Sequence, residues 1–212
     1  MKIETLSVGA LQTNCYILYD KTTGIIVDPG ADADRIIQTV KNRSISVSHI
    51  VLTHGHYDHI LALPDVQAAF PDAKLCLCHL EADLINDPYK NLTAYGAKTI
   101  PSVKADIFLK EGDTIPVGSQ SLTVIETPGH TAGSICLLGE KILISGDTLF
   151  YMGMGRCDLP TGDLRQEVHS IQNKLFSLAD EVAVYPGHGP ATTIGFEKKN
   201  NEVFHYTDRS ER

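Results

Sequence analysis

Two short apolar runs near the N-terminus predict a pair of antiparallel strands. Residues 14–19 and 24–28 are both rich in strand-forming side chains. The connection across residues 20–23 has the length and the turn-forming composition of a hairpin loop. The beginning of the chain therefore predicts a β-hairpin whose second strand ends at an aspartate.

A helix and a further strand are expected after this hairpin. Asp32 stands where a helix cap is needed, and apolar residues recur after it at helical spacing. These apolar residues are Ile36, Ile37 and Val40. Residues 49–53 then form an apolar run that predicts a buried strand. The order in the first half is hairpin, helix, strand.

The same order recurs in the second half of the chain. Residues 134–138 and 141–145 predict a second hairpin, whose returning strand again leads to an aspartate. A helix is expected from Asp163, with Gln166 completing a capping box. Its apolar stripe would consist of Leu164, Val168, Ile171 and Leu175. A strand over residues 181–185 follows this helix.

This repetition predicts one domain over residues 1–212, built from two similar halves at about 1–115 and 116–212. Each half would form one sheet, and the two sheets would pack together with helices outside. The segment 86–106 between the halves shows little periodicity. A loop of this length is either a lid over a binding site or a plain surface connection.

Composition and charge narrow the classes of function. The chain has 212 residues, of which 42% are hydrophobic and 21% charged, as in ordinary globular proteins. Its 18 Lys and Arg against 26 Asp and Glu give a net charge of −8, which disfavours nucleic acid and anionic membranes as partners. Glu4 interrupts the segment where a secretion signal needs an apolar run, and no run approaches the length of a membrane span. We therefore expect a cytoplasmic protein that acts on a small molecule.

The cysteine pattern predicts free thiols. The five cysteines have irregular spacing, and four of them lie in apolar, strand-like runs. Cys76 and Cys78 are one residue too close for the usual Cys-x-x-Cys metal clip, so a buried strand is the favoured interpretation there. Cys157 would be reactive only if it were exposed and its pKa were lowered.

One segment, directly after the strand predicted over residues 49–53, concentrates groups that bind metals. Three imidazoles and a carboxylate fall within six residues: His54, His56, Asp58 and His59. Imidazole suits zinc, iron or nickel, whereas a carboxylate suits harder cations. A histidine pair two residues apart can hold one ion, and Asp58 and His59 on the next turn can face a second.

Three further residues are placed to complete such a site. His130 precedes the second predicted hairpin and Asp147 follows it, so both should lie at the same end of that sheet. His188 follows the strand predicted over residues 181–185. Each of the three stands beside a glycine at a strand terminus, and we expect them to converge on the turn that contains His54.

These residues resemble those of the metallo-β-lactamase superfamily of hydrolases, whose His-x-His-x-Asp-His motif and later His, Asp and His are all present here. The resemblance extends from the strand end at Asp28 to residues 187–189. It implies an α+β fold, a four-layer αβ/βα sandwich of two mixed sheets with outer helices, with the site at one edge between the sheets. With an aspartate at position 147, the chain resembles the glyoxalase II-like, or hydroxyacylglutathione hydrolase-like, branch, and in particular its compact bacterial members.

The resemblance also implies two divalent metal ions per chain, with zinc favoured and iron or manganese as alternatives. The implied ligands are His54, His56 and His130 for one ion, Asp58, His59 and His188 for the other, and Asp147 as a bridge. Asp28 would orient one of these ligands from behind. Two such ions can share a hydroxide and polarise the carbonyl that it attacks, and Asp58 would pass a proton as the intermediate breaks down.

The loop after the bridging aspartate is expected to lie over the ions. By resemblance, Arg156 would bind a carboxylate of the substrate, a task for which the bidentate guanidinium is suited. The alternative for Arg156 is an ion pair with Asp158 or Asp163. Tyr151 is a further candidate for contact with the substrate.

The favoured function is hydrolysis of a thioester, such as the glutathione thioester S-lactoyl glutathione, by attack of a metal-bridging hydroxide. Two alternatives come from the same superfamily: a persulfide dioxygenase with a single iron, and hydrolysis of a lactone or β-lactam. The net charge disfavours cleavage of nucleic acid, and the complete ligand set disfavours a binding module without catalysis. The remaining histidines, His49, His79, His169 and His205, are expected not to bind metal.

Overall fold

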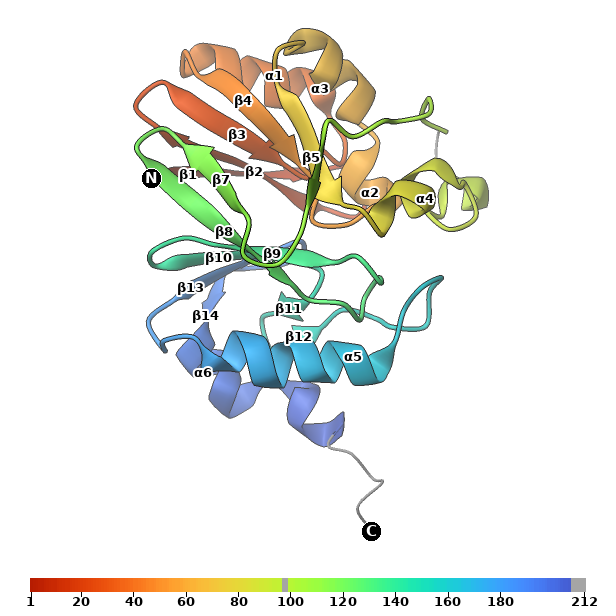
Figure 1. Cartoon of the computed structure of the whole chain (residues 1–212), viewed down its shortest axis with the longest axis vertical. Coiled ribbons are helices and arrows are strands. Elements are labelled where there is room, and N and C mark those ends of the chain that lie inside the picture. Colours follow the sequence, from red (N-terminus) through yellow and green to blue (C-terminus); the bar gives the residue numbers. More distant parts are fainter. Residues whose placement is uncertain (97–98, 207–212) are drawn as a thin grey trace.

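Two six-stranded sheets lie face to face, and helices cover the outer side of each (Figure 1). The computed structural model describes residues 1–96 and 99–206. In spatial order, the first sheet consists of β1 (Lys2–Val8), β2 (Thr13–Asp20), β3 (Thr23–Val27), β4 (Ser46–Val51), β5 (Lys74–Cys78) and β6 (Ile107–Leu109). The second consists of β14 (Thr192–Thr193), β13 (Ala183–Pro186), β10 (Ile142–Gly146), β9 (Ile135–Leu138), β8 (Gln120–Glu126) and β7 (Thr114–Val117).

The helices form the outer layers. The first sheet is covered by α1 (Ala33–Asn42) and α3 (Leu63–Ala69), and the second by α5 (Leu164–His169) and α6 (Ile194–Asn200). The shorter elements are α2 (Tyr57–Ile60), α4 (Glu81–Asn86) and the ribbon of β11 (Leu149–Phe150) and β12 (Gly153–Met154). Short turns of helix cover Thr93–Tyr95, Ser170–Lys174, Leu175–Ser177 and Glu202–Tyr206. In the part of the chain that the structure describes, no helix has the length and apolar character needed to cross a bilayer.

The central strands are buried on both faces, which explains why they read as continuous apolar runs. In β2, Cys15 and Ile17 pack in the cluster that includes α1 and α3, whereas Tyr16 and Leu18 pack against the second sheet. All four side chains are at most 2% exposed. Burial of each large aliphatic side chain contributes about 1.5–3 kcal/mol, so these strands hold the four layers together.

The predicted sandwich and its element order are confirmed. β2 and β3 pair as an antiparallel hairpin, and β4 returns parallel to β3 after α1. β9 and β10 form the second hairpin, and β13 returns parallel to β10 after α5. The strands after the helices have other bounds than expected, with Ser46–Val51 for β4 and Ala183–Pro186 for β13. β4 ends early because the backbone N–H of Thr53 donates to a side chain rather than to a strand.

Three details of the predicted helices were wrong. Asp32 precedes α1 as expected, but its carboxylate accepts from the Gly9 N–H at 3.0 Å and does not cap the helix. Asp163 does cap α5, yet the Gln166 amide donates to the Asp163 side chain instead of closing a capping box. Leu164 is 42% exposed and lies outside the stripe. Leu164 is the first residue of α5, whereas Ile171 and Leu175 lie in the core as expected, although the helix continues into a wider π turn over Ser170–Lys174.

All five cysteines are free thiols, as predicted, and the Cys76–Cys78 segment is the buried strand β5. Burial, followed by neighbouring carboxylates, raises the pKa of the Cys157 thiol to about 12. This thiol is therefore protonated at neutral pH and is a weak nucleophile.

Candidate metal centre

The two sheets bring the ligand candidates together at one edge. His54 and His56 follow the end of β4, and α2 begins directly after His56, so that Asp58 and His59 lie in its first turn. The Gly30 backbone permits this turn to approach closely, since a Cβ at Gly30 would overlap the Asp58 carbonyl oxygen. The second sheet contributes the remaining candidates from the ends of its strands.

Three groups of side chains lie within metal-ligating distance of one another. The groups are His54, His56 and His130; His54, His59 and Asp147; and Asp58, His59 and His188. In each group the possible ligand atoms are all within 4.8 Å of one another. Every residue predicted as a metal ligand is therefore present in this cluster, although the two halves of the chain contribute them from distant positions.

Asp147 lies between these groups. Its Oδ1 is 3.3 Å from His59 Nε2, and its Oδ2 is 3.7 Å from His130 Nε2 and 3.5 Å from His188 Nε2. A Cβ at Gly187 would overlap Asp147 Oδ1, so the glycine leaves room for this carboxylate. Asp147 thus faces histidines on both sides of the cluster.

Asp28 supports the cluster from behind. Its Oδ1 accepts from the Thr53 backbone N–H at 2.8 Å, and its Oδ2 accepts from Thr53 Oγ1 at 2.6 Å. The same Oδ2 lies 2.9 Å from His59 Nδ1. Thr53 Oγ1 also lies 3.1 Å from His54 Nδ1, so both imidazoles are oriented through their Nδ1 atoms. Their Nε2 atoms remain free to bind a cation.

Backbone carbonyls orient two further histidines in the same way. His130 Nδ1 donates to the Arg156 carbonyl oxygen at 2.8 Å, and His188 Nδ1 donates to that of Leu11 at 3.1 Å. Their Nε2 atoms consequently point into the cluster. His56 differs because its Nδ1 faces inward, 2.9 Å from His130 Nε2.

The electrostatics divide the imidazoles of the cluster: burial favours the neutral form of His54 and His56, whereas nearby carboxylates favour the charged form of His59. Burial, followed by the neighbouring imidazoles, lowers the pKa of His54 far below its usual value and that of His56 to about 3. Burial alone would lower the pKa of His59, but the carboxylates around it, Asp147 first, raise it well above its usual value. Burial alone would raise the pKa values of Asp58 and Asp147, but the neighbouring groups together, His59 first, outweigh this and both pKa values are lowered.

The unpartnered atoms of the cluster fit a metal site. Among the atoms that face the cluster, His54 Nε2, His59 Nε2 and Asp147 Oδ1 are buried and have no hydrogen-bond partner in the described part of the chain. Buried polar atoms without partners are costly, and here they gather in one place with the donor types that divalent cations prefer. The residues present therefore fit a divalent metal.

Two buried glutamates that the sequence analysis did not single out fix the loops that carry these ligands. Glu81 accepts from the Gly55 N–H, from Thr131 Oγ1 and from the Gly133 N–H at 2.8–2.9 Å, and so connects the loops of both halves. Glu167 accepts from the His130 N–H at 2.9 Å. Neither glutamate belongs to a recognisable motif, and their partners are 26 to 52 residues away.

Of the two predicted substrate contacts, Arg156 lines a cavity beside this centre, whereas Tyr151 is not among the described residues that line it. Arg156 forms a bidentate ion pair with the exposed Asp158, both contacts being 2.7 Å. Tyr151 is 46% exposed and its ring stacks on Phe196 at 5.2 Å. The ion pair is the alternative considered for Arg156, and contact of either side chain with a substrate stays a prediction.

The other four histidines lie away from the cluster. Among the described residues, none of the groups close enough to hold a metal includes His49, His79, His169 or His205. His49 instead lies 2.9 Å from Ser48 Oγ, and His169 lies 3.0 Å from Asn173 Nδ2.

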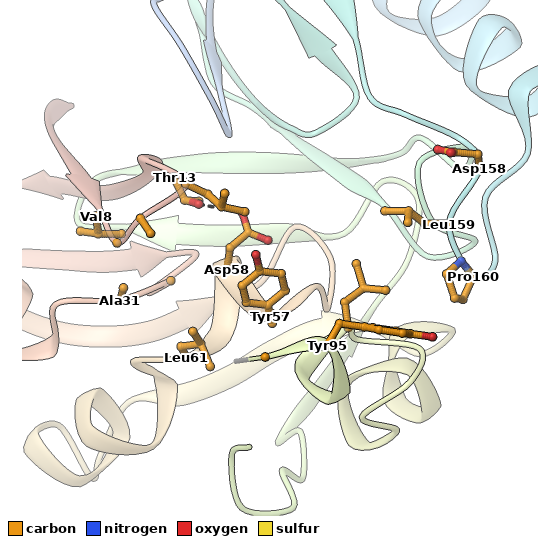
Figure 2. A pocket seen from close by; sticks show the side chains of 16 residues that line it. Val8, Thr13, Ala31, Tyr57, Asp58, Leu61, Tyr95, Asp158, Leu159 and Pro160 are labelled. Carbon is orange, nitrogen blue, oxygen red and sulfur yellow. Dashed lines mark hydrogen bonds between the residues drawn. The ribbon is translucent and has the colours of Figure 1, made fainter. Parts of the chain in front are cut away.

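Two cavities open on the cluster. The smaller one, of about 440 Å³, is lined by five of the seven candidate ligands and by residues of the loop 150–159; the five are His56, Asp58, His130, Asp147 and His188. The larger one, of about 820 Å³, adjoins it and is shown in Figure 2. Tyr57, Asp58 and Leu92 line both. Leu92 and Tyr95 belong to the segment 86–106, which therefore lines a cavity; residues 97–98 of that segment lie outside the described residues.

Comparison with known proteins is consistent with this geometry. The family model of the metallo-β-lactamase superfamily matches residues 8–188. The hydroxyacylglutathione hydrolase GloC of Haemophilus influenzae is 33% identical over 205 residues, which cover 95% of this chain and 97% of that protein.

Solved structures of similar sequence have the same fold. The B3 metallo-β-lactamase BLEG-1 superposes with a TM-score of 0.89 at 35% identity, covering 95% of this chain and 98% of that one. TTHA1623, solved in a di-iron-bound form, superposes with a TM-score of 0.84 at 30% identity, covering 94% and 98%. Because the family match spans most of the chain and the fold agrees over nearly all of it, this protein belongs to the metallo-β-lactamase superfamily of metal-dependent hydrolases.

Proposed function

We propose that the protein hydrolyses thioesters with the help of two divalent metal ions, zinc being favoured over iron or manganese. The observation that carries the proposal is the position of Asp147 between groups of imidazoles, among which the buried, inward-facing Nε2 atoms of His54 and His59 have no hydrogen-bond partner in the described part of the chain. One group would hold the first ion through His54, His56 and His130. The other would hold the second through Asp58, His59 and His188, with Asp147 shared by both.

Divalent ions in such a site lower the pKa of a coordinated water to about 7 and polarise the carbonyl that is attacked. The chain then has to hold the reacting groups and move a proton. Asp58 is placed for the proton, because its Oδ2 accepts from Thr13 Oγ1 at 2.8 Å and lies 3.1 Å from His188 Nε2, at the boundary of the two cavities. An ionised carboxylate held in this way can take up a proton and deliver it to the leaving thiolate.

The choice of a thioester is supported by similarity. The relative from Haemophilus influenzae carries the name hydroxyacylglutathione hydrolase. A glutathione thioester is therefore the first substrate class to examine. If the ion pair opens, Arg156, which lines the smaller cavity, would be available to a substrate carboxylate.

Turnover of S-lactoyl glutathione by the zinc-loaded protein is the direct test. We expect hydrolysis that disappears on chelation and returns when zinc is added. A nitrocefin assay and a panel of lactones serve as comparisons, and an oxygen electrode with glutathione persulfide examines dioxygenase activity. Silence on all thioesters together with turnover of one of these other substrates would contradict the proposal.

A further inference from the structure

We propose that the larger cavity beside Asp58 binds an apolar group of the substrate, so that the preferred thioester carries a sizeable aliphatic or aromatic portion. This inference rests on the proposed function, because it names the substrate class for the same site. The observation behind it is an apolar cavity that continues directly from the metal cluster.

The walls of the cavity come from both halves of the chain (Figure 2). Val8, Ala31 and Leu61 form one side, near Asp58, and all belong to the first half. Leu159 and Pro160 of the second half lie on the opposite side with Tyr95. A cavity of about 820 Å³ built in this way is within the size range of small-molecule sites.

Several apolar side chains at this cavity are only partly covered. Leu11 is 51% exposed and Tyr95 is 75% exposed, although most large apolar side chains of the chain are buried. Exposed apolar surface in a concave site gains free energy when it is covered by an apolar ligand. The cavity therefore favours a hydrocarbon group over a strongly hydrated one.

The charges around the cavity also favour an apolar group as its ligand. Among the described lining residues, the ionised side chains are the carboxylates Asp58 and Asp158. Arg156 does not line this cavity and is engaged by Asp158 through two contacts of 2.7 Å. In the described part of the cavity wall, no unpaired cation is therefore available to a substrate carboxylate, whereas a neutral apolar portion needs none.

The position of the cavity connects it to the reaction. Asp58 and Tyr57 line both cavities, and in Figure 2 the Asp58 carboxylate faces the space between the two sides of the larger one. A carbonyl held at the metal cluster and an apolar group in the larger cavity can therefore belong to one molecule. The apolar group would stand on the acyl side or on the thiol side of that carbonyl.

Two series of neutral thioesters test the proposal. In the first, acyl groups from acetyl to octanoyl are joined to N-acetylcysteamine, and in the second, acetyl is joined to alkanethiols of increasing length. Burial of each methylene predicts a gain of about fourfold in kcat/KM until the cavity is filled. A gain in the first series assigns the cavity to the acyl group, and a gain in the second assigns it to the thiol. Flat rates in both, with S-lactoyl glutathione preferred, would overturn the inference while leaving the proposed function intact.

Two substitutions sharpen this test. Ala31→Phe fills the cavity and Leu159→Asp adds a charge to its wall, and each should reduce the ratio of long-chain to short-chain kcat/KM at least tenfold. Leu159→Met keeps the volume and Leu80→Asp lies on exposed surface outside this cavity, so both should keep the ratio of the unmodified protein.

Binding of a neutral apolar fluorophore separates the two proposals. N-phenyl-1-naphthylamine should bind the metal-loaded protein and should bind at least tenfold more weakly to A31F and L159D. This readout does not need turnover, so it judges the cavity even if no thioester is hydrolysed. Equal binding by all variants would refute the apolar site.

Discussion

The two halves of the molecule use the same local fold to place a carboxylate in different ways. In the first half, Asp28 directly follows β3 and has a φ of +51°, and its carboxylate turns back to hold Thr53 and His59. In the second half, Gly146 has the corresponding left-handed φ of +49°, and the carboxylate follows one residue later at Asp147.

This shift of one residue gives the two carboxylates different roles. Asp28 orients other residues of the cluster, whereas Asp147 points into it. With the left-handed position occupied by the aspartate itself, the carboxylate bonds to the backbone and side chain of Thr53 on the neighbouring segment. With glycine in that position, the next carboxylate points among His59, His130 and His188. We infer that Asp28 holds other ligands rigidly in place, whereas Asp147 is the shared ligand. Substitution of each aspartate can test this.

Loss of the facing carboxylate should have the largest effect. Asp147→Ala would remove the group that both sets of histidines face, so we expect loss of much of the bound metal. Activity should fall on the order of a hundredfold to a thousandfold, because bound metal contributes several kcal/mol to the transition state. Metal content by mass spectrometry and kcat/KM measure this. Asp72→Asn, on an exposed turn, is the control, and full turnover by D147A would show that Asp147 is not the shared ligand.

Loss of the supporting carboxylate should have a smaller effect. Asn at position 28 tolerates the left-handed backbone, but its amide would place N–H groups against the donors of Thr53 and His59. We expect Asp28→Asn to weaken metal binding roughly 10- to 100-fold while the fold is kept. A competition assay with a chromogenic chelator measures the metal Kd. A Kd equal to that of the unmodified protein would remove Asp28 from the orienting role.

Loss of the hydrogen bonds by which Glu81 connects the two halves should have the third-largest effect. In Glu81→Gln, one of the two carboxylate oxygens that accept from Gly55, Thr131 and Gly133 would be replaced by an amide NH2 group, which is a donor. The unsatisfied buried group should cost about 1–3 kcal/mol of unfolding free energy and should weaken metal binding by roughly tenfold. Denaturant unfolding and the metal Kd, with the exposed Glu140→Gln as the matched control, measure both effects. A change in stability alone would show that Glu81 does not position the ligands.

The smallest effect on metal binding is expected for Glu167, where the change concerns the dependence of stability on pH. Burial raises the pKa of Glu167 from 4.5 to about 9, against the opposing effect of the His130 N–H. The unfolded chain releases this proton near pH 4.5 and the folded chain keeps it to about pH 9, so folding loses stability as pH rises through that window. Glu167→Gln removes the effect, up to about 1.4 kcal/mol per pH unit.

The measurement is the melting temperature of chelated protein at several pH values. The melting temperature of E167Q, relative to that of the unmodified protein, should rise steadily from pH 5 to pH 8. The relative melting temperature of the exposed Glu181→Gln variant should not. Parallel curves for E167Q and the unmodified protein would contradict the raised pKa.

The sequence contained most of what determines the layers of the fold. Continuous apolar runs marked β2, β3, β9 and β10, because these strands are buried on both faces. β1 was not anticipated, since its residues alternate between partly exposed and buried positions and its pairing with β2 comes from the sheet. The apolar stripe of α5 was misjudged at Leu164, because this residue begins the helix and lies 42% exposed, beyond the part of the stripe that packs in the core.

The candidate ligands were recognisable because histidine and aspartate beside glycine at strand ends form a local pattern. Glu81 and Glu167 were not, because a glutamate in a helix is ordinarily a solvent-exposed residue and only the tertiary fold buries it. The apolar cavity was also beyond sequence reasoning. Its walls combine Val8, Leu61 and Leu159 from segments that only the folded chain brings together.

The central claim is that ligands from both halves hold two divalent ions that are needed for activity. Metal content per chain, followed together with activity while a chelator removes the metal, tests it most directly. The account predicts two ions per chain in the fully active protein and loss of activity as they are removed. Fewer than one ion per chain at neutral pH, with activity unchanged after chelation, would contradict it.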